Sequence, residues 1–174
     1  NTTGSSPLSL ILSSPVFNGS LVKTGNGALR LDNTGLGFTG LNLAARVLFL
    51  NTANMLPAGA TFNLGAGATL DLNNVAQFVP QLSGSGRITN SNTTANTLTF
   101  GSDNQSTTFG GQFSAYSAAT LATLNAVKIG TGSITLTGSS NATGTFSAFQ
   151  GNTILSDSGA VAFGTTLAAN GTLT

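Results

Sequence analysis

A ten-residue pattern occurs twice in this chain and limits what it can fold into. Residues 22–31 read VKTGNGALRL, and residues 127–136 read VKIGTGSITL. Partial copies at 64–72 and 82–89 keep the two glycines and the residues after them. Each copy is a Gly-x-Gly corner followed by alternating apolar and polar residues, which indicate a strand with one buried face. Such self-similarity favours an architecture of stacked repeats.

The repeats predict a parallel β-solenoid with irregular coils. In this fold each coil lays its strands on those of the coil below, apolar side chains fill the interior and glycine occupies the corners. At roughly 20 residues per coil the chain would make eight or nine coils. The residues expected at corners and in strands are Lys23, Gly25, Gly27, Leu29, Leu31, Gly84, Gly86, Lys128, Gly130, Gly132, Ile134 and Leu136.

A β-sandwich is the alternative fold, because many short strands separated by turns suit it as well. Helical candidates are few. Residues 41–55 show some apolar spacing, and residues 115–126 have the composition for a turn or two of helix. The pattern therefore predicts an all-β fold with little helix.

Composition supports a folded chain and narrows its chemistry. Asn, Ser, Thr and Gly make up half of the 174 residues, but 40% are hydrophobic and eleven are Phe, which need burial. Only 5% are charged, and His and Cys are absent. Zinc sites, thiol nucleophiles and Ser-His-Asp triads need those two residue types. We therefore expect no enzyme and no cofactor.

The charges and the apolar runs also bear on partners. A net charge of +1, carried by scattered residues, does not provide the basic face that nucleic acids need. The longest apolar stretch, residues 41–50, is too short and too polar to span a membrane as a helix. The sequence starts at Asn1 without the basic region of a signal peptide, so we expect either that a leader has been removed or that this is a piece of a longer protein.

A few polar and aromatic residues are candidates for chemistry. An acid pair among Asp32, Asp71, Asp103 and Asp157 would suit glycoside hydrolysis. The favoured interpretation is structural, with Asp32 and Asp71 at corresponding places after a strand and the other two in turns. Lys23 and Lys128 are expected to point outward and discourage edge pairing. The residues expected to stack in the core are Phe100, Phe109, Phe113, Phe146, Phe149 and Phe163.

The repeated segments resemble a known family. Residues 23–31 and 128–136 are similar to the lysine-threonine-glycine strand of the autotransporter-associated β-strand repeat, with Ile129 replacing the usual Thr. Residues 67–73, 82–86 and 109–113 come in the order that such proteins show, and the likeness covers about residues 21–174. The resemblance implies a secreted bacterial surface protein whose passenger region is a right-handed β-helix, with no catalytic residue.

Two functions follow as expectations. The first is a structural extracellular protein, either displayed on a cell surface or polymerised head to tail with copies of itself. Residues 1–20 would form an N-terminal strand or cap and residues 21–174 the solenoid, with assembly through strands that contain Leu8, Leu10, Leu12 and Leu173. The second is an adhesin or polysaccharide-binding passenger, which should show exposed aromatic residues in a row on one face.

Overall fold

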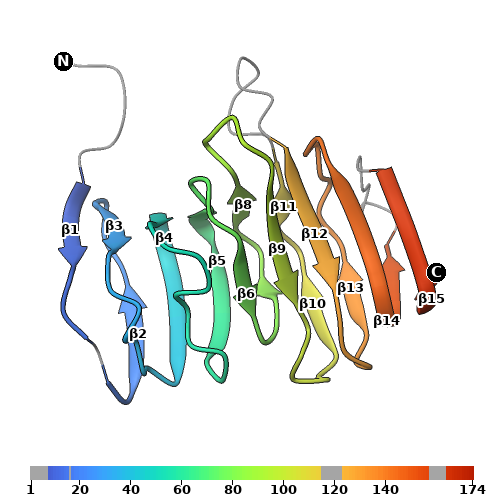
Figure 1. Ribbon diagram of the computed structural model, residues 1–174, viewed down its shortest axis with the longest axis horizontal. Coiled ribbons are helices and arrows are strands. Elements are labelled where there is room, and N and C mark those ends of the chain that lie inside the picture. Colours follow the sequence, from blue (N-terminus) through green and yellow to red (C-terminus); the bar gives the residue numbers. More distant parts are fainter. Residues whose placement is uncertain (1–7, 16, 115–122, 157–163) are drawn as a thin grey trace.

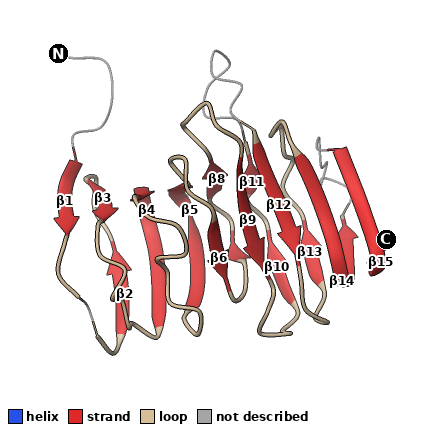
Figure 2. Ribbon diagram, viewed as in Figure 1, coloured by secondary structure: helices blue, strands red, loops and turns tan. Residues whose placement is uncertain are grey.

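The structure is a computed structural model that describes residues 8–15, 17–114, 123–156 and 164–174 (Figures 1 and 2). It confirms the prediction of an all-β parallel solenoid, which makes about seven turns and contains no helix among the described residues. The strands are β1 (Leu8–Leu12), β2 (Ser20–Lys23), β3 (Ala28–Leu31), β4 (Gly40–Leu50), β5 (Thr61–Asp71), β6 (Gln77–Val79), β7 (Ser83–Gly84), β8 (Arg87–Thr89), β9 (Asn96–Phe100), β10 (Thr107–Phe109), β11 (Gln112–Phe113), β12 (Leu124–Lys128), β13 (Ile134–Leu136), β14 (Thr145–Leu155) and β15 (Gly164–Leu173).

Each strand pair among the described residues is parallel, so the β-sandwich alternative, which needs antiparallel sheets, is wrong. The strands form three stacks along the solenoid axis. Stack A contains β2, β7, β10, β13, the first halves of β4 and β5, and the second halves of β14 and β15. Stack B contains β1, β3, β8, β11 and the second halves of β4 and β5. Stack C contains β6, β9, β12 and the first halves of β14 and β15.

Coil length varies along the axis, which explains why about seven turns form where eight or nine were expected. In stack A, Ser20 pairs with Gly40 and Gly40 with Thr61, so these coils take 20 and 21 residues. Farther along, Gly84 pairs with Phe109 and Phe109 with Leu136, which are separations of 25 and 27 residues. The extra residues of the longer coils lie between strands, where added length costs little conformational entropy.

The core runs along the solenoid axis and is filled from all three stacks. Consecutive coils of stack B each contribute a fully buried aliphatic side chain to the core. These side chains are Leu31, Leu50, Leu70 and Ile88. Four phenylalanines of the predicted core are buried as expected, and their ring centroids lie 5.4 Å apart for Phe109 and Phe113, and 6.4 Å apart for Phe100 with Phe113 and with Phe146. Aromatic pairs in this range contribute beyond the area that they bury.

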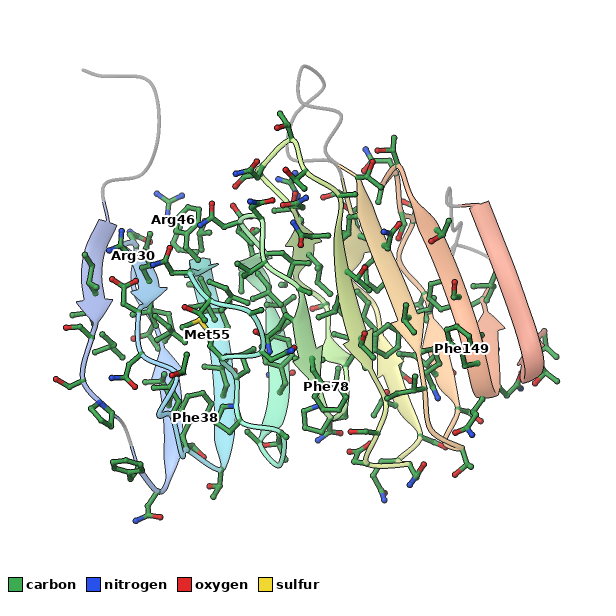
Figure 3. All side chains as sticks on the ribbon, in the orientation of Figure 1. Arg30, Phe38, Arg46, Met55, Phe78 and Phe149 are labelled. Atoms are coloured by element: carbon green, nitrogen blue, oxygen red, sulfur yellow. The ribbon has the colours of Figure 1, made fainter. Side chains whose placement is uncertain are left out.

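The structure bears on the sequence-based expectations for three single segments, as far as their residues are described. Residues 41–50 are not helical but belong to β4, where inward positions alternate with outward ones. Of the second helical candidate, residues 115–122 lie outside the described residues, and Leu124 and Ala126 are in β12. Phe149 was wrongly assigned to the core, because it lies 48% exposed on the bend of β14 (Figure 3). Phe163 lies outside the described residues.

Side chains join the coils on the outer surface as well. The Nδ2 of Asn63 donates to the Oδ1 of Asn42 at 3.1 Å, and the Nδ2 of Asn96 donates to the Oδ1 of Asn74 at 3.2 Å. Both bonds cross from one coil to the next. Stacked amide side chains therefore link neighbouring coils, as they do in other cross-strand stacks.

Candidate functional site: the lysine corners and the two end coils

The first lysine corner joins β2 to β3 in one of the first coils. Lys23 is the last residue of β2, and its side chain is turned inward and only 9% exposed. Its Nζ donates to the carbonyl oxygens of Thr24 at 2.6 Å and Gly25 at 3.0 Å. Gly25 has a φ of +72°, which turns its carbonyl toward the ammonium group and which few other residues adopt easily. The lysine thus binds the backbone of its own corner.

The second lysine corner joins β12 to β13 in the C-terminal part of the solenoid, in a coil with neighbours on both sides. The Nζ of Lys128 donates to the carbonyl oxygens of Ile129 at 2.6 Å and Gly130 at 2.8 Å, and reaches Gln150 of the next coil at 3.4 Å. The residue is 1% exposed, and Gly130 has a φ of +73°. Burial lowers the pKa of the Lys128 ammonium, while the charge of Asp103 acts in the opposite direction.

The expectation that both lysines point outward is therefore wrong. The position of each Lys next to a Gly corner predicts an outward charge that discourages edge pairing, yet each ammonium group is bound by backbone carbonyls inside the corner. Carbonyls freed by a tight turn need donors when they are buried, and a long cationic side chain supplies up to three. The sequence contained a signal for this, because a lysine stands two residues before a corner glycine in both copies.

The corner glycines differ in how closely neighbouring coils approach them. A Cβ on Gly130 would lie 2.0 Å from the carbonyl oxygen of Gly101, and one on Gly132 would lie 2.3 Å from that of Gln105. A Cβ on Gly25 would meet nothing within 4 Å. At the partial copy, Gly84 has a φ of +99° and Gly86 is packed against the Gly65 carbonyl. The glycine requirement is thus steric as well as conformational inside the stack.

Each described aspartate accepts hydrogen bonds that hold a turn or join two coils, as the structural interpretation expected. Asp32 forms a bidentate pair with Arg30 at 2.6 and 2.7 Å. Asp71 is fully buried, and its Oδ1 accepts from the amides of Asn73 and Ser91. The Oδ1 of Asp103 accepts from the amide of Gln105, which closes a turn. Asp157 lies outside the described residues.

Asp32 and Asp71 do not occupy corresponding places, which corrects the sequence alignment. Arg30 pairs with Phe49, and Phe49 pairs with Asp71. Asp71 is therefore in register with Arg30 and not with Asp32. The two carboxyl groups also respond oppositely to their surroundings. The hydrogen bond from Arg30 lowers the pKa of Asp32, whereas burial raises the pKa of Asp71.

The N-terminal coil, which comprises the described residues from 8 to 23 with β1 and β2, presents apolar side chains to solvent. Four of the five large hydrophobic residues that are exposed among those described belong to it, namely Leu10 at 51%, Ile11 at 44%, Phe17 at 67% and Val22 at 53%. Of the expected assembly residues, Leu10 is exposed, Leu12 packs partly against the core, and the side chain of Leu8 is not described. Sequence reasoning missed Phe17 and Val22.

The backbone edges of this coil are open as well. Among the described residues, β1 pairs only with β3 and β2 only with β4, so each strand has one edge without a partner strand. The one charged residue from 8 to 23 is the buried Lys23. Natural proteins usually protect such edges with exposed charges, bulges or covering segments.

The C-terminal coil is the opposite end of the stack (Figure 1). Within the described chain β15 pairs only with β14, and it contains no charged residue. The Oγ1 of Thr172 donates to the Oδ1 of Asn152 at 2.9 Å, which extends the side-chain ladders to the last coil. The side chain of Leu173 is not described, but its backbone pairs with Thr153.

The described residues contain no cluster of three or more side chains of the types that bind metals, and no helix able to cross a membrane. Comparison with known proteins finds no match among family models, curated proteins or solved structures. The structure supports the resemblance to the autotransporter-associated repeat at the level of the fold alone, because the chain is a β-solenoid.

Proposed function

We propose that this chain is a structural extracellular β-solenoid, displayed on a cell surface or assembled into filaments by end-to-end stacking of copies. The observation that carries the proposal is the N-terminal coil, where open strand edges, exposed apolar side chains and the absence of exposed charge coincide. Burial of this apolar surface by another coil would be favourable, since buried apolar area contributes about 25 cal/mol per Å².

The directions of the strands favour head-to-tail contact. All strand pairs among the described residues are parallel. If the C-terminal coil of one copy lay on the N-terminal coil of a second copy, the strands on both sides of the junction would therefore run in the same direction. Residues 170–173 of β15 and residues 20–23 of β2 both belong to stack A, and among the described residues each has no partner strand on its outer side. A contact that joins two different surfaces repeats without closing and gives a fibre.

The scarcity of charge supports the same proposal. From residue 129 to residue 156 there is no charged side chain, and the N-terminal strands contribute only the buried Lys23. Stacked coils of such composition do not repel one another, and their Asn and Thr side chains can extend the ladders across a junction. Secretion to a bacterial surface is proposed on the resemblance of the repeats.

A binding module is the second candidate, and its expected row of exposed aromatic residues is not present among the described residues. Phe17 and Phe149, which are 67% and 48% exposed, lie toward opposite ends of the solenoid, between β1 and β2 and in β14 respectively. A structural role therefore accounts better for the exposed apolar residues, which concentrate at one end.

Assembly is tested by adding charge to the open end. Sedimentation velocity of the chain should show mass that rises with concentration, and electron microscopy should show fibres whose axis follows the coils. The double substitution Leu10→Lys/Val22→Lys should keep the protein monomeric at concentrations at least ten times higher. Thr61→Lys/Thr108→Lys adds the same two charges to exposed positions of β5 and β10, which have neighbouring coils on both sides, and should assemble like the wild type. A wild-type chain that stays monomeric at high concentration, unchanged by removal of residues 1–14, would contradict the filament version of the proposal.

A further inference from the structure

A groove of about 460 Å³ opens on the surface of the solenoid, and it extends from the turn that stacks on the N-terminal coil to β6 and β9. It lies where stack C begins. The coils from β6 onward have a strand on this side, whereas the two preceding coils have turns at residues 33–36 and 54–60. Figure 3 labels Met55 and Phe78, which line the groove from the turn and from β6.

The local sequence explains why no strand fills this place. Asn54 has a φ of +51°, outside the range of a strand, and Pro57 has no amide hydrogen to donate to a neighbouring strand. The carbonyl of Pro57 accepts from Ala60 at 3.1 Å, which closes a turn. One backbone hydrogen bond, from Asn54 to Ala76 at 3.0 Å, joins this turn to the residues before β6 in the described chain. β6 accordingly pairs with β9 alone.

The chemistry of the lining selects the kind of ligand. None of the residues that line the groove is charged, and both polar and apolar side chains are among them. Amide and hydroxyl side chains come from Thr34, Asn54, Gln77 and Thr99, and apolar surface from Met55 and Phe78. Sugar rings present hydroxyl groups at their edges and C–H groups on their faces, which match amides and an aromatic ring respectively.

Gln77 provides an independent indication. Its side chain is 1% exposed, and its Nε2 donates to the carbonyl oxygen of Phe78 at 2.6 Å. Its Oε1 receives no hydrogen bond from the described residues. Buried acceptors are rarely left unsatisfied, because the loss of hydration costs about 1–3 kcal/mol. Gln77 is among the residues that line the groove, so a ligand hydroxyl group that reaches this amide would supply the missing donor.

We propose that this groove binds a neutral oligosaccharide, with Phe78 stacking on a sugar ring and the side chains of Asn54, Gln77 and Thr99 binding its hydroxyl groups. The volume suits a ligand of about two rings, given that pockets for small molecules span roughly 300–1,000 Å³. The open side of the groove lets a longer chain continue past the protein. The site does not depend on end-to-end assembly.

The probe is an array of neutral and anionic di- to hexasaccharides, followed by saturation-transfer NMR with each neutral sugar that binds. Wild-type protein should bind neutral sugars in preference to anionic ones. Phe78→Ala should weaken binding at least tenfold, and Thr99→Val, which keeps the shape of a half-exposed strand residue, should weaken it several-fold. Phe149→Ala removes an exposed phenyl ring elsewhere and should leave binding unchanged.

Circular dichroism of each variant separates loss of binding from loss of folding, and Thr99→Val is the variant for the comparison if Phe78→Ala fails to fold. The proposal is overturned if no neutral sugar binds, if Phe149→Ala weakens binding as much as the groove variants do, or if the groove binds extended peptides in place of sugars. None of these outcomes depends on whether the chain forms fibres.

Discussion

The two lysine corners share a sequence pattern but not an environment. The corner at Lys23 lies in one of the first coils, where its glycine has free space around it, while the corner at Lys128 is covered by coils on both sides. Lys23 binds two carbonyls, and Lys128 binds the same two positions and a third from the next coil. The comparison shows that the ten-residue pattern encodes a local corner, and that stacking sets how much the corner matters for stability.

The largest difference is expected for the corner glycines. Gly130→Ala should lower the free energy of unfolding by about 3 kcal/mol or more, because the new methyl group meets the Gly101 carbonyl and the backbone is strained at positive φ. Gly25→Ala should cost about 1 kcal/mol, from the positive φ alone. Chemical denaturation of the two variants measures both. Equal losses would mean that stacking adds nothing to the glycine requirement.

A smaller difference is expected for the lysines. Lys128→Met keeps the length of the side chain but leaves three carbonyls without their donor, and should cost about 2 kcal/mol. Relief of the buried charge, whose pKa burial lowers, offsets part of the loss. Lys23→Met should cost about 1 kcal/mol, since Thr24 and Gly25 are exposed and water can replace the ammonium. Thermal unfolding of both variants provides the test, and a greater loss for Lys23→Met would reverse the comparison.

The smallest expected effect is the change in stability when Asp71 or Asp32 is replaced by Asn, and its sign is opposite at the two sites. A carboxyl group whose pKa is raised on folding stabilises the fold below its ordinary pKa, and this contribution is lost as the pH rises through the folded-state pKa. Asp71 is such a group, so Asp71→Asn should raise the free energy of unfolding at pH 7 by about 1 kcal/mol at most, seen as a slightly higher melting temperature, and should leave it unchanged near pH 3. The amide oxygen can still accept from Asn73 and Ser91.

Asp32 lies near the N-terminal end and should behave in the reverse way. The bond from Arg30 lowers the pKa of this carboxyl, so its stabilisation is present above the ordinary pKa and is lost as the pH falls through the lowered one. Asp32→Asn should therefore lower stability slightly at pH 7. The effect is small because the Arg30–Asp32 pair is exposed to solvent and salt screens its interaction. Melting curves of both variants at pH 3 and pH 7 provide the check. A rise in stability for Asp32→Asn at pH 7 would contradict the assignment.

The sequence predicted the local conformations well, for reasons visible at single residues. Gly25 and Gly130 adopt the positive φ that their Gly-x-Gly pattern indicated, and Leu29, Leu31, Ile134 and Leu136 face the core as their alternation predicted. The helical interpretation of residues 41–55 failed because β4 continues through a corner at Arg46, whose φ is +64°. The guanidinium Nε of Arg46 donates to the carbonyl of Asn26 in the preceding coil, a contact that no local pattern reveals.

The exposed end coil was only partly predictable. Val22 and Val127 occupy the same position of the repeated pattern, yet Val22 is 53% exposed, while Val127 is half-buried between β9 and β14. No property of the valine itself distinguishes them. The groove at Phe78 also escaped prediction, because it forms between turns and strands of different coils.

By itself the sequence determined that the chain would turn at particular glycines, alternate its side chains between core and surface, and stack in parallel coils, because φ preferences and apolar periodicity act over a few residues. Only the tertiary structure decided which stack each corner joins: the pattern at Lys23 leads from stack A to stack B, and the same pattern at Lys128 leads from stack C to stack A. The reason is that coil lengths vary from one turn to the next. The position of a corner around the axis therefore depends on all the residues between two corners, and its burial depends on whether another coil lies on either side.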